Sequence, residues 1–162
     1  ADTLAADDPA LVCPAGTADL TPLVNSDDGY CLLYPLGFEV APAPGVVTIT
    51  VPAMVTEEDP EPVTAALTIE RLAAPAGGDA ASLAADRLPS ETGTEEIMLG
   101  SETAVVATTT ARDLPARQLF VVHDEAAFVL TLTPTDANAY PDAALDAELF
   151  WETAVGSFTF LP

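Results

Sequence analysis

The chain has 162 residues, of which 49% are hydrophobic, so it can bury the core of one domain. Its charge is strongly negative: 26 aspartates and glutamates face four arginines and no lysine, which gives a formal net charge of −22. Nucleic acids and anionic membrane surfaces are bound through clustered cations, so this composition excludes both as partners.

The N-terminal part, residues 1–28, is polar, rich in alanine and aspartate, and without a sustained period. We interpret it as a leader that precedes a domain over residues 29–162. The first residue is alanine rather than methionine, and no stretch of about 20 apolar residues occurs, as a transmembrane helix would need. We therefore expect a removed signal peptide or a lipid-anchored export signal, and no transmembrane segment.

Two cysteines, Cys13 and Cys31, are the only ones in the chain. An even number in an acidic, lysine-free chain favours a disulfide formed outside the reducing cytosol. The alternatives are two buried free thiols or two ligands of a metal site, but zinc takes about four ligands and the chain has a single histidine. A disulfide would pin the leader to the first strand and contribute about 3 kcal/mol.

The strands begin after this leader. Residues 30–34 are apolar on both faces, which predicts a buried strand, and a turn over residues 35–38 leads out to a loop broken by Pro42 and Pro44. Residues 46–51 and 65–72 alternate between apolar and polar side chains, which predicts two half-buried strands.

The second half begins with a short helix. Asp79 is the expected N-cap of this helix, which runs through Leu88 and is stopped by Pro89. Residues 95–99 are interpreted as a short connector. Three antiparallel strands are predicted over residues 104–110, 118–122 and 127–133, the last two joined by a polar turn.

A longer helix is predicted from Pro141 to about residue 155, because proline suits the first helical turn. Leu145 and Leu149 lie one turn apart and mark the expected buried stripe, which Phe150, Ala154 and Val155 widen. Gly156 is the expected C′ residue. The last segment places Phe158 and Phe160 at alternate positions.

Short connections between these elements cannot build a doubly wound parallel sheet. The predicted fold class is therefore α+β, with an antiparallel β-sheet flanked by helices.

Two segments resemble the PsbP-like family: residues 29–38, which read GYCLLYPLGF, and residues 149–161, which read LFWETAVGSFTFL. Residues 117–133 are similar to the late hairpin of this family. The resemblance implies an α/β/α sandwich and a non-enzymatic history, with Tyr34, Pro35, Gly37 and Phe38 as turn and packing residues. Many bacterial relatives look like secreted domains or lipoproteins. Their binding residues cannot be matched to positions here.

Catalytic motifs are absent from the sequence. His123 could serve a Ser-His-Asp arrangement with Asp124 and Ser157, but no nucleophile elbow occurs, and we interpret His123 as a solvated turn residue. No phosphate-binding loop, dinucleotide-binding turn or zinc motif is present, so we predict no cofactor.

Two acidic loops could supply oxygen ligands to calcium: residues 25–29 and residues 57–59. Neither has the spacing of an EF-hand, so we interpret them as solvated loops and assign no metal ligands.

Together, these features favour a non-enzymatic, monomeric, extracytoplasmic binding domain, secreted or tethered to the cell envelope, with an unknown protein or small-molecule partner. Two alternatives are a hydrolase that uses carboxylates, and a structural envelope domain stabilised by calcium.

Overall fold

The computed structural model describes residues 13–52, 55–58, 62–74, 78–89, 92–100, 102–111 and 113–161. Within these ranges the chain forms strands and two helices in the following order: β1 (Leu20–Asn25), β2 (Tyr30–Pro35), β3 (Glu39–Ala43), β4 (Val46–Thr50), β5 (Ala66–Ala73), α2 (Ala80–Arg87), β6 (Thr94–Leu99), β7 (Glu102–Ala111), β8 (Leu114–His123), β9 (Ala126–Thr133), α3 (Pro141–Ser157) and β10 (Thr159–Phe160).

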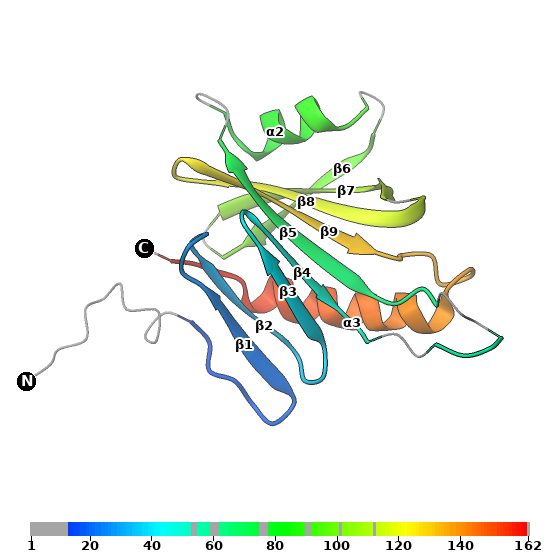
Figure 1. The fold of residues 1–162 in the computed structure, drawn as a ribbon. Helices are drawn as coiled ribbons and strands as arrows, with labels where there is room; N and C mark the ends of the chain where they lie inside the picture. Colours follow the sequence, from blue (N-terminus) through cyan, green and yellow to red (C-terminus); the bar gives the residue numbers. More distant parts are fainter. Residues whose placement is uncertain are drawn as a thin grey trace, which may run out of the picture.

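The strands build two antiparallel sheets (Figure 1). The large sheet has seven strands in the order β3-β4-β5-β9-β8-β7-β6, and the small sheet has three in the order β1-β2-β10. Helix α2 covers one face of the large sheet, and α3 lies on the other face beside the small sheet. The predicted α+β class, with antiparallel sheet flanked by helices, is confirmed.

Three segments that were given other interpretations form strands. Residues 20–25 form β1, where no strand was predicted, and they pair with β2 from Leu20 opposite Pro35 to Asn25 opposite Tyr30. Residues 94–99 form β6 rather than a connector, and residues 39–43, which were expected to lead into a proline-broken loop, form β3. All three are edge strands in which at most one side chain is buried, so they lack the apolar alternation by which strands are recognised.

Helix α3 buries a different stripe from the predicted one. Leu145 and Leu149 are 61% and 55% exposed, so their assignment to the buried face was wrong. Phe150 and Ala154 are buried as expected. The buried face consists of small and aromatic side chains one turn apart: Ala143, Ala144, Ala147, Phe150, Trp151 and Ala154. Alanines let the helix approach the sheet, and the two aromatic rings fill the remaining space.

The end of α3 also differs from the prediction. Gly156 lies inside the helix, and its backbone does not adopt the left-handed conformation of a C′ glycine. The helix continues because Ser157 completes its last turn: the hydroxyl donates to the carbonyl of Thr153 at 2.7 Å and accepts the backbone N–H of Leu33 at 2.8 Å. One side chain thus joins the end of α3 to the middle of β2.

The two sheets meet through a cluster of aromatic rings. Tyr30 stacks on Phe158 with ring centroids 5.3 Å apart and meets the edge of Phe128 at 5.7 Å. Phe160 contacts both Phe128 and Phe158. Tyr30 comes from β2, Phe128 from β9, and the other two from the end of the chain, so this cluster joins segments that lie far apart in the sequence.

Helix α2 begins at the predicted cap. The carboxylate of Asp79 accepts the backbone N–H of Ser82 at 2.9 Å and the hydroxyl of Ser82 at 3.0 Å, and these hydrogen bonds lower the pKa of Asp79. Leu83 and Ala84 then pack on Phe120 and Val129 of the large sheet.

Tyr30 makes the stability of this core pH-dependent. Burial raises its pKa from 10.0 to about 12; the negative charge of Asp28 adds to this, and a hydrogen bond from Asn25 opposes it. Because the unfolded chain ionises first, stability should fall by about 3 kcal/mol as pH rises from 10 to 12.

Urea unfolding at a series of alkaline pH values measures this loss. The unfolding free energy of Tyr30→Phe should change little over this pH range, whereas the control Tyr140→Phe should lose stability as wild type does. An equal decline in wild type and Tyr30→Phe would contradict the assignment.

The disulfide gives a second prediction. In the structure the Sγ atoms of Cys13 and Cys31 lie 2.04 Å apart and the Cα atoms 5.9 Å apart, and the two residues are separated by 18 positions. Opening a loop of this length should cost about 3 kcal/mol of unfolding free energy. Cys13→Ala tests this while leaving the buried Cys31 in place.

Reduced wild type should lose the same stability as Cys13→Ala. Mass spectrometry after alkylation provides the direct check, because neither cysteine should react until a reductant is added. Two alkylated cysteines in unreduced protein would show that the bond does not form.

Candidate functional site

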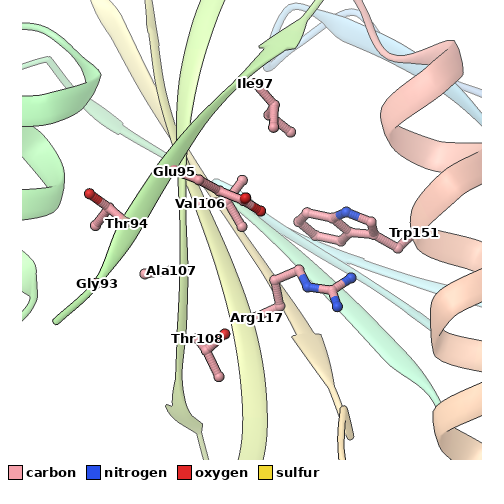
Figure 2. Close-up of a pocket in the computed structure, with 9 residues that line it drawn as sticks. All are labelled: Gly93, Thr94, Glu95, Ile97, Val106, Ala107, Thr108, Arg117 and Trp151. Carbon is pink, nitrogen blue, oxygen red and sulfur yellow. The ribbon is translucent and has the colours of Figure 1, made fainter.

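A groove of about 580 Å³ lies between the β6–β8 end of the large sheet and α3 (Figure 2). Its lining combines apolar and polar side chains: Glu95, Ile97, Val106, Thr108, Arg117 and Trp151. We call it the α3 groove. In Figure 2, Glu95 points from β6 toward the indole of Trp151, while Thr94 points to the other face of the sheet. Alternation along β6 therefore decides which side chains reach the groove.

Arg117 and Trp151 form the wall of the groove on the side of α3. The guanidinium lies 5.3 Å from the centroid of the indole ring, a cation–π contact. Both terminal nitrogens of Arg117 bond to the carboxylate of Glu148, at 2.5 and 3.3 Å. Glu148 lies about one helical turn before Trp151, so both residues lie on one face of α3 and hold the guanidinium of Arg117 together, one by an ion pair and the other by its ring.

This arrangement gives the α3 groove a flat aromatic surface and both signs of charge. Trp151 is only 8% exposed, and its ring faces the apolar side chains of Ile97 and Val106. Glu95 supplies a carboxylate that forms no ion pair with any described residue. The groove can therefore hold an amphipathic group through apolar contact and polar anchoring.

Sequence reasoning did not single out Arg117 or Trp151. Two signals were present: Trp151 is the only tryptophan, and Arg117 is one of four basic residues in a chain of net charge −22. Neither signal shows that the two meet, because β8 and α3 are separated in sequence and are brought together only by the packing of the helix.

His123 is not the solvated turn residue that the sequence suggested. Its ring stacks on Phe160 with centroids 4.2 Å apart, and its two nitrogens lie 3.2 Å from Glu102 and 3.4 Å from Asp124. The hydroxyl of Ser157 is used by α3 and β2, as described above, so the structure does not bring a Ser-His pair together. His123 packs the end of the chain onto β8.

The first acidic loop forms the tight turn between β1 and β2. The side-chain amide of Asn25 donates to the carboxylate of Asp28, and its oxygen accepts the backbone N–H of Asp28, each at 3.0 Å. Gly29 follows at a φ of 88°. Arg71 donates to the carbonyl of Asp27 at 3.0 Å. These contacts use oxygens that a calcium ion would need.

The second acidic loop is described only in part, because Asp59 lies outside the described residues. Across the described ranges, no three side chains of His, Cys, Asp or Glu are grouped to hold a metal ion. Neither α2 nor α3 has the length and hydropathy of a helix that crosses a membrane.

The shielding of the Trp151 indole by Arg117 can be measured by fluorescence quenching. Arg117→Ala should expose the indole and raise the acrylamide quenching constant of its fluorescence at least about twofold, since the guanidinium shields one ring face. The control Arg87→Ala removes an exposed arginine from α2 and should leave quenching unchanged. Equal quenching in all three proteins would contradict the stacking.

Comparison with known proteins finds similarity to solved structures and none at the level of sequence families. The sequence matches no protein-family model and no curated protein. Among solved structures, cyanobacterial PsbP from Synechocystis sp. PCC 6803 is 16% identical with a TM-score of 0.52, covering 90% of this chain and 94% of that one. A protein from Bacteroides thetaiotaomicron is 10% identical with a TM-score of 0.53, covering 87% of this chain and 48% of that one.

LpqN of Mycobacterium tuberculosis, a protein involved in cell envelope biogenesis, is 17% identical with a TM-score of 0.43, covering 88% of this chain and 91% of that one. The fold expected from residues 29–38 and 149–161 is borne out by the likeness to cyanobacterial PsbP. This chain has the PsbP-like fold.

Proposed function

We propose that this protein is a non-enzymatic, extracytoplasmic binding domain, and that the α3 groove holds its ligand or a part of its partner. The observation that carries the proposal is the wall of the groove, where Arg117 is fixed over Trp151 by Glu148. A rigid aromatic surface with a prearranged charge loses little conformational freedom on binding.

The extracytoplasmic part of the proposal is supported by the Cys13–Cys31 disulfide, since such bonds persist in oxidising compartments. The extreme negative charge is consistent with a surface that stays hydrated and rejects other anions. The domain division, with residues 1–28 as an N-terminal segment pinned by the disulfide, is part of this proposal. So are the monomeric state and the secreted or tethered location.

The alternative of a carboxylate hydrolase has weaker support. Glycoside hydrolysis uses two carboxyl groups on either side of the scissile bond. Of the described residues that line the α3 groove, Glu95 alone carries a carboxylate, and Glu148, next to the groove wall, is paired with Arg117. The groove therefore offers a binding surface more readily than an acid and a base.

An uncharged dye tests whether the groove accepts a ligand. N-phenyl-1-naphthylamine carries no charge to be repelled, and Trp151 is the only tryptophan, so energy transfer from its indole reports dye bound to this chain, and a variant of the groove then locates it. We expect saturable quenching of Trp151 with sensitised dye emission. Thr108→Phe, which places a ring in the groove, should weaken dye binding about tenfold or more.

Thr109→Phe is the matched control, because adjacent residues of β7 face opposite sides of the sheet and Thr109 does not line the groove. It should bind the dye as wild type does. Absence of energy transfer, or equal loss in both variants, would overturn the proposed binding site.

A further inference from the structure

The two edges of the large sheet are unequal. The strand at one edge, β3, contains Pro42, which has no N–H to offer to another strand. The strand at the other edge, β6, contains no proline over its six residues. Among the described residues, only β7 shares backbone hydrogen bonds with β6. The outward N–H and C=O groups of β6 are thus available for a further strand.

Hollows lie on both faces of the sheet beside β6. The α3 groove lies on one face, and a second groove of about 470 Å³ lies on the other, between β6 and α2. Ala84, Leu88 and Val105 give this α2 groove an apolar lining. A strand added at β6 would direct its side chains alternately toward these two faces, so both sets would find room.

The side chains of β6 specify what such a strand should carry. Glu95 and Glu96 are exposed, point to opposite faces, and form no ion pair with a described residue. Met98 is 60% exposed, and Ile97 is half-buried at the α3 groove. Residues directly opposite each other on paired strands share a face, so each glutamate favours a cation and each apolar residue favours an apolar one.

We propose that β6 binds an extended segment of a partner protein by antiparallel strand addition, and that this segment has two apolar residues followed by two consecutive basic residues. The apolar pair lies opposite Met98 and Ile97, and the basic pair lies opposite Glu96 and Glu95. Antiparallel pairing is favoured because it is the more stable arrangement for a single added strand. This inference rests on the proposed binding function and names the class of partner.

A second copy of this chain does not suit the edge. Full-length antiparallel pairing of β6 with another β6 would place Glu95 opposite Met98 and Glu96 opposite Ile97, and would leave Glu95 of one copy diagonally beside Glu96 of the other, between molecules that each carry a formal net charge of −22. Each carboxylate would then meet an apolar side chain instead of a cation, and a shifted register that sets the glutamates directly opposite each other is destabilised by like-charge repulsion. The same glutamates that repel a copy attract a basic segment.

Synthetic peptides test the proposal on the whole chain. The probe is acetyl-Thr-Val-Val-Arg-Arg-Thr-amide, and its control replaces both arginines with glutamate. We expect isothermal titration calorimetry to detect the arginine peptide and not the glutamate peptide. Hydrogen exchange of the backbone amides should slow at residues 95–98 and stay unchanged at residues 39–43 of the opposite edge.

Two further controls separate strand addition from attraction to an acidic surface. Methylating alternate backbone nitrogens of the peptide blocks one of its edges: one of the two alternate sets should abolish binding and the other should preserve it. On the protein, Glu95→Gln with Glu96→Gln should weaken binding about tenfold, whereas Glu57→Gln with Glu58→Gln, on the loop between β4 and β5, should not.

Any one of four results would overturn the inference: equal binding of both methylated peptides, equal loss of binding in the two double variants, protection at β3 instead of β6, or dimerisation of the free chain. If the dye still binds beside Trp151 while the arginine peptide does not bind, the edge assignment fails and the proposed function stands. If neither binds, both fail.

Discussion

The cluster of Tyr30, Phe128, Phe158 and Phe160 is the contact on which the rest of the structure depends. The small sheet has only three strands, and its strand β10 has two residues, so it cannot be stable by backbone pairing alone. The rings give it an apolar face against the large sheet. Their geometry mixes stacked and edge-on contacts, which fixes how the two sheets are oriented.

The α3 groove follows from how this contact positions the helix. Ser157 ties the end of α3 to β2, and the helix packs mainly against β2 and β9. The outer strands β6 and β7 extend beyond the surface that the helix covers (Figure 1). A groove remains between them, and the long side chains of Arg117 and Trp151 form its wall instead of filling it. The candidate site is therefore a product of incomplete coverage rather than of a dedicated loop.

Most elements of the fold can be predicted from the sequence, whereas little of the candidate site can. The strands β2, β4, β5, β7, β8 and β9 carry apolar runs or alternating apolar residues, and Asp79 and Pro141 mark the starts of the helices, so these elements could be predicted. The edge strands β1, β3 and β6 could not, because strands with at most one buried side chain need no such pattern. The buried face of α3 was misjudged because leucine outranks alanine in hydrophobicity, whereas close packing on a sheet favours small residues. The contact of Arg117 with Trp151 depends on tertiary packing and leaves no local pattern.

The position of β2 between β1 and β10 has a consequence for biosynthesis. Its neighbour on one side comes from the early part of the chain and its neighbour on the other from the last residues described. A ribosome or an export channel releases these segments in order, so the hairpin of β1 and β2 emerges long before Phe158 and Phe160 can cover Tyr30. Until then the hairpin presents an uncovered apolar face. The cross-link between Cys13 and Cys31 spans only this early part, so it can hold the hairpin in shape while the remaining chain arrives.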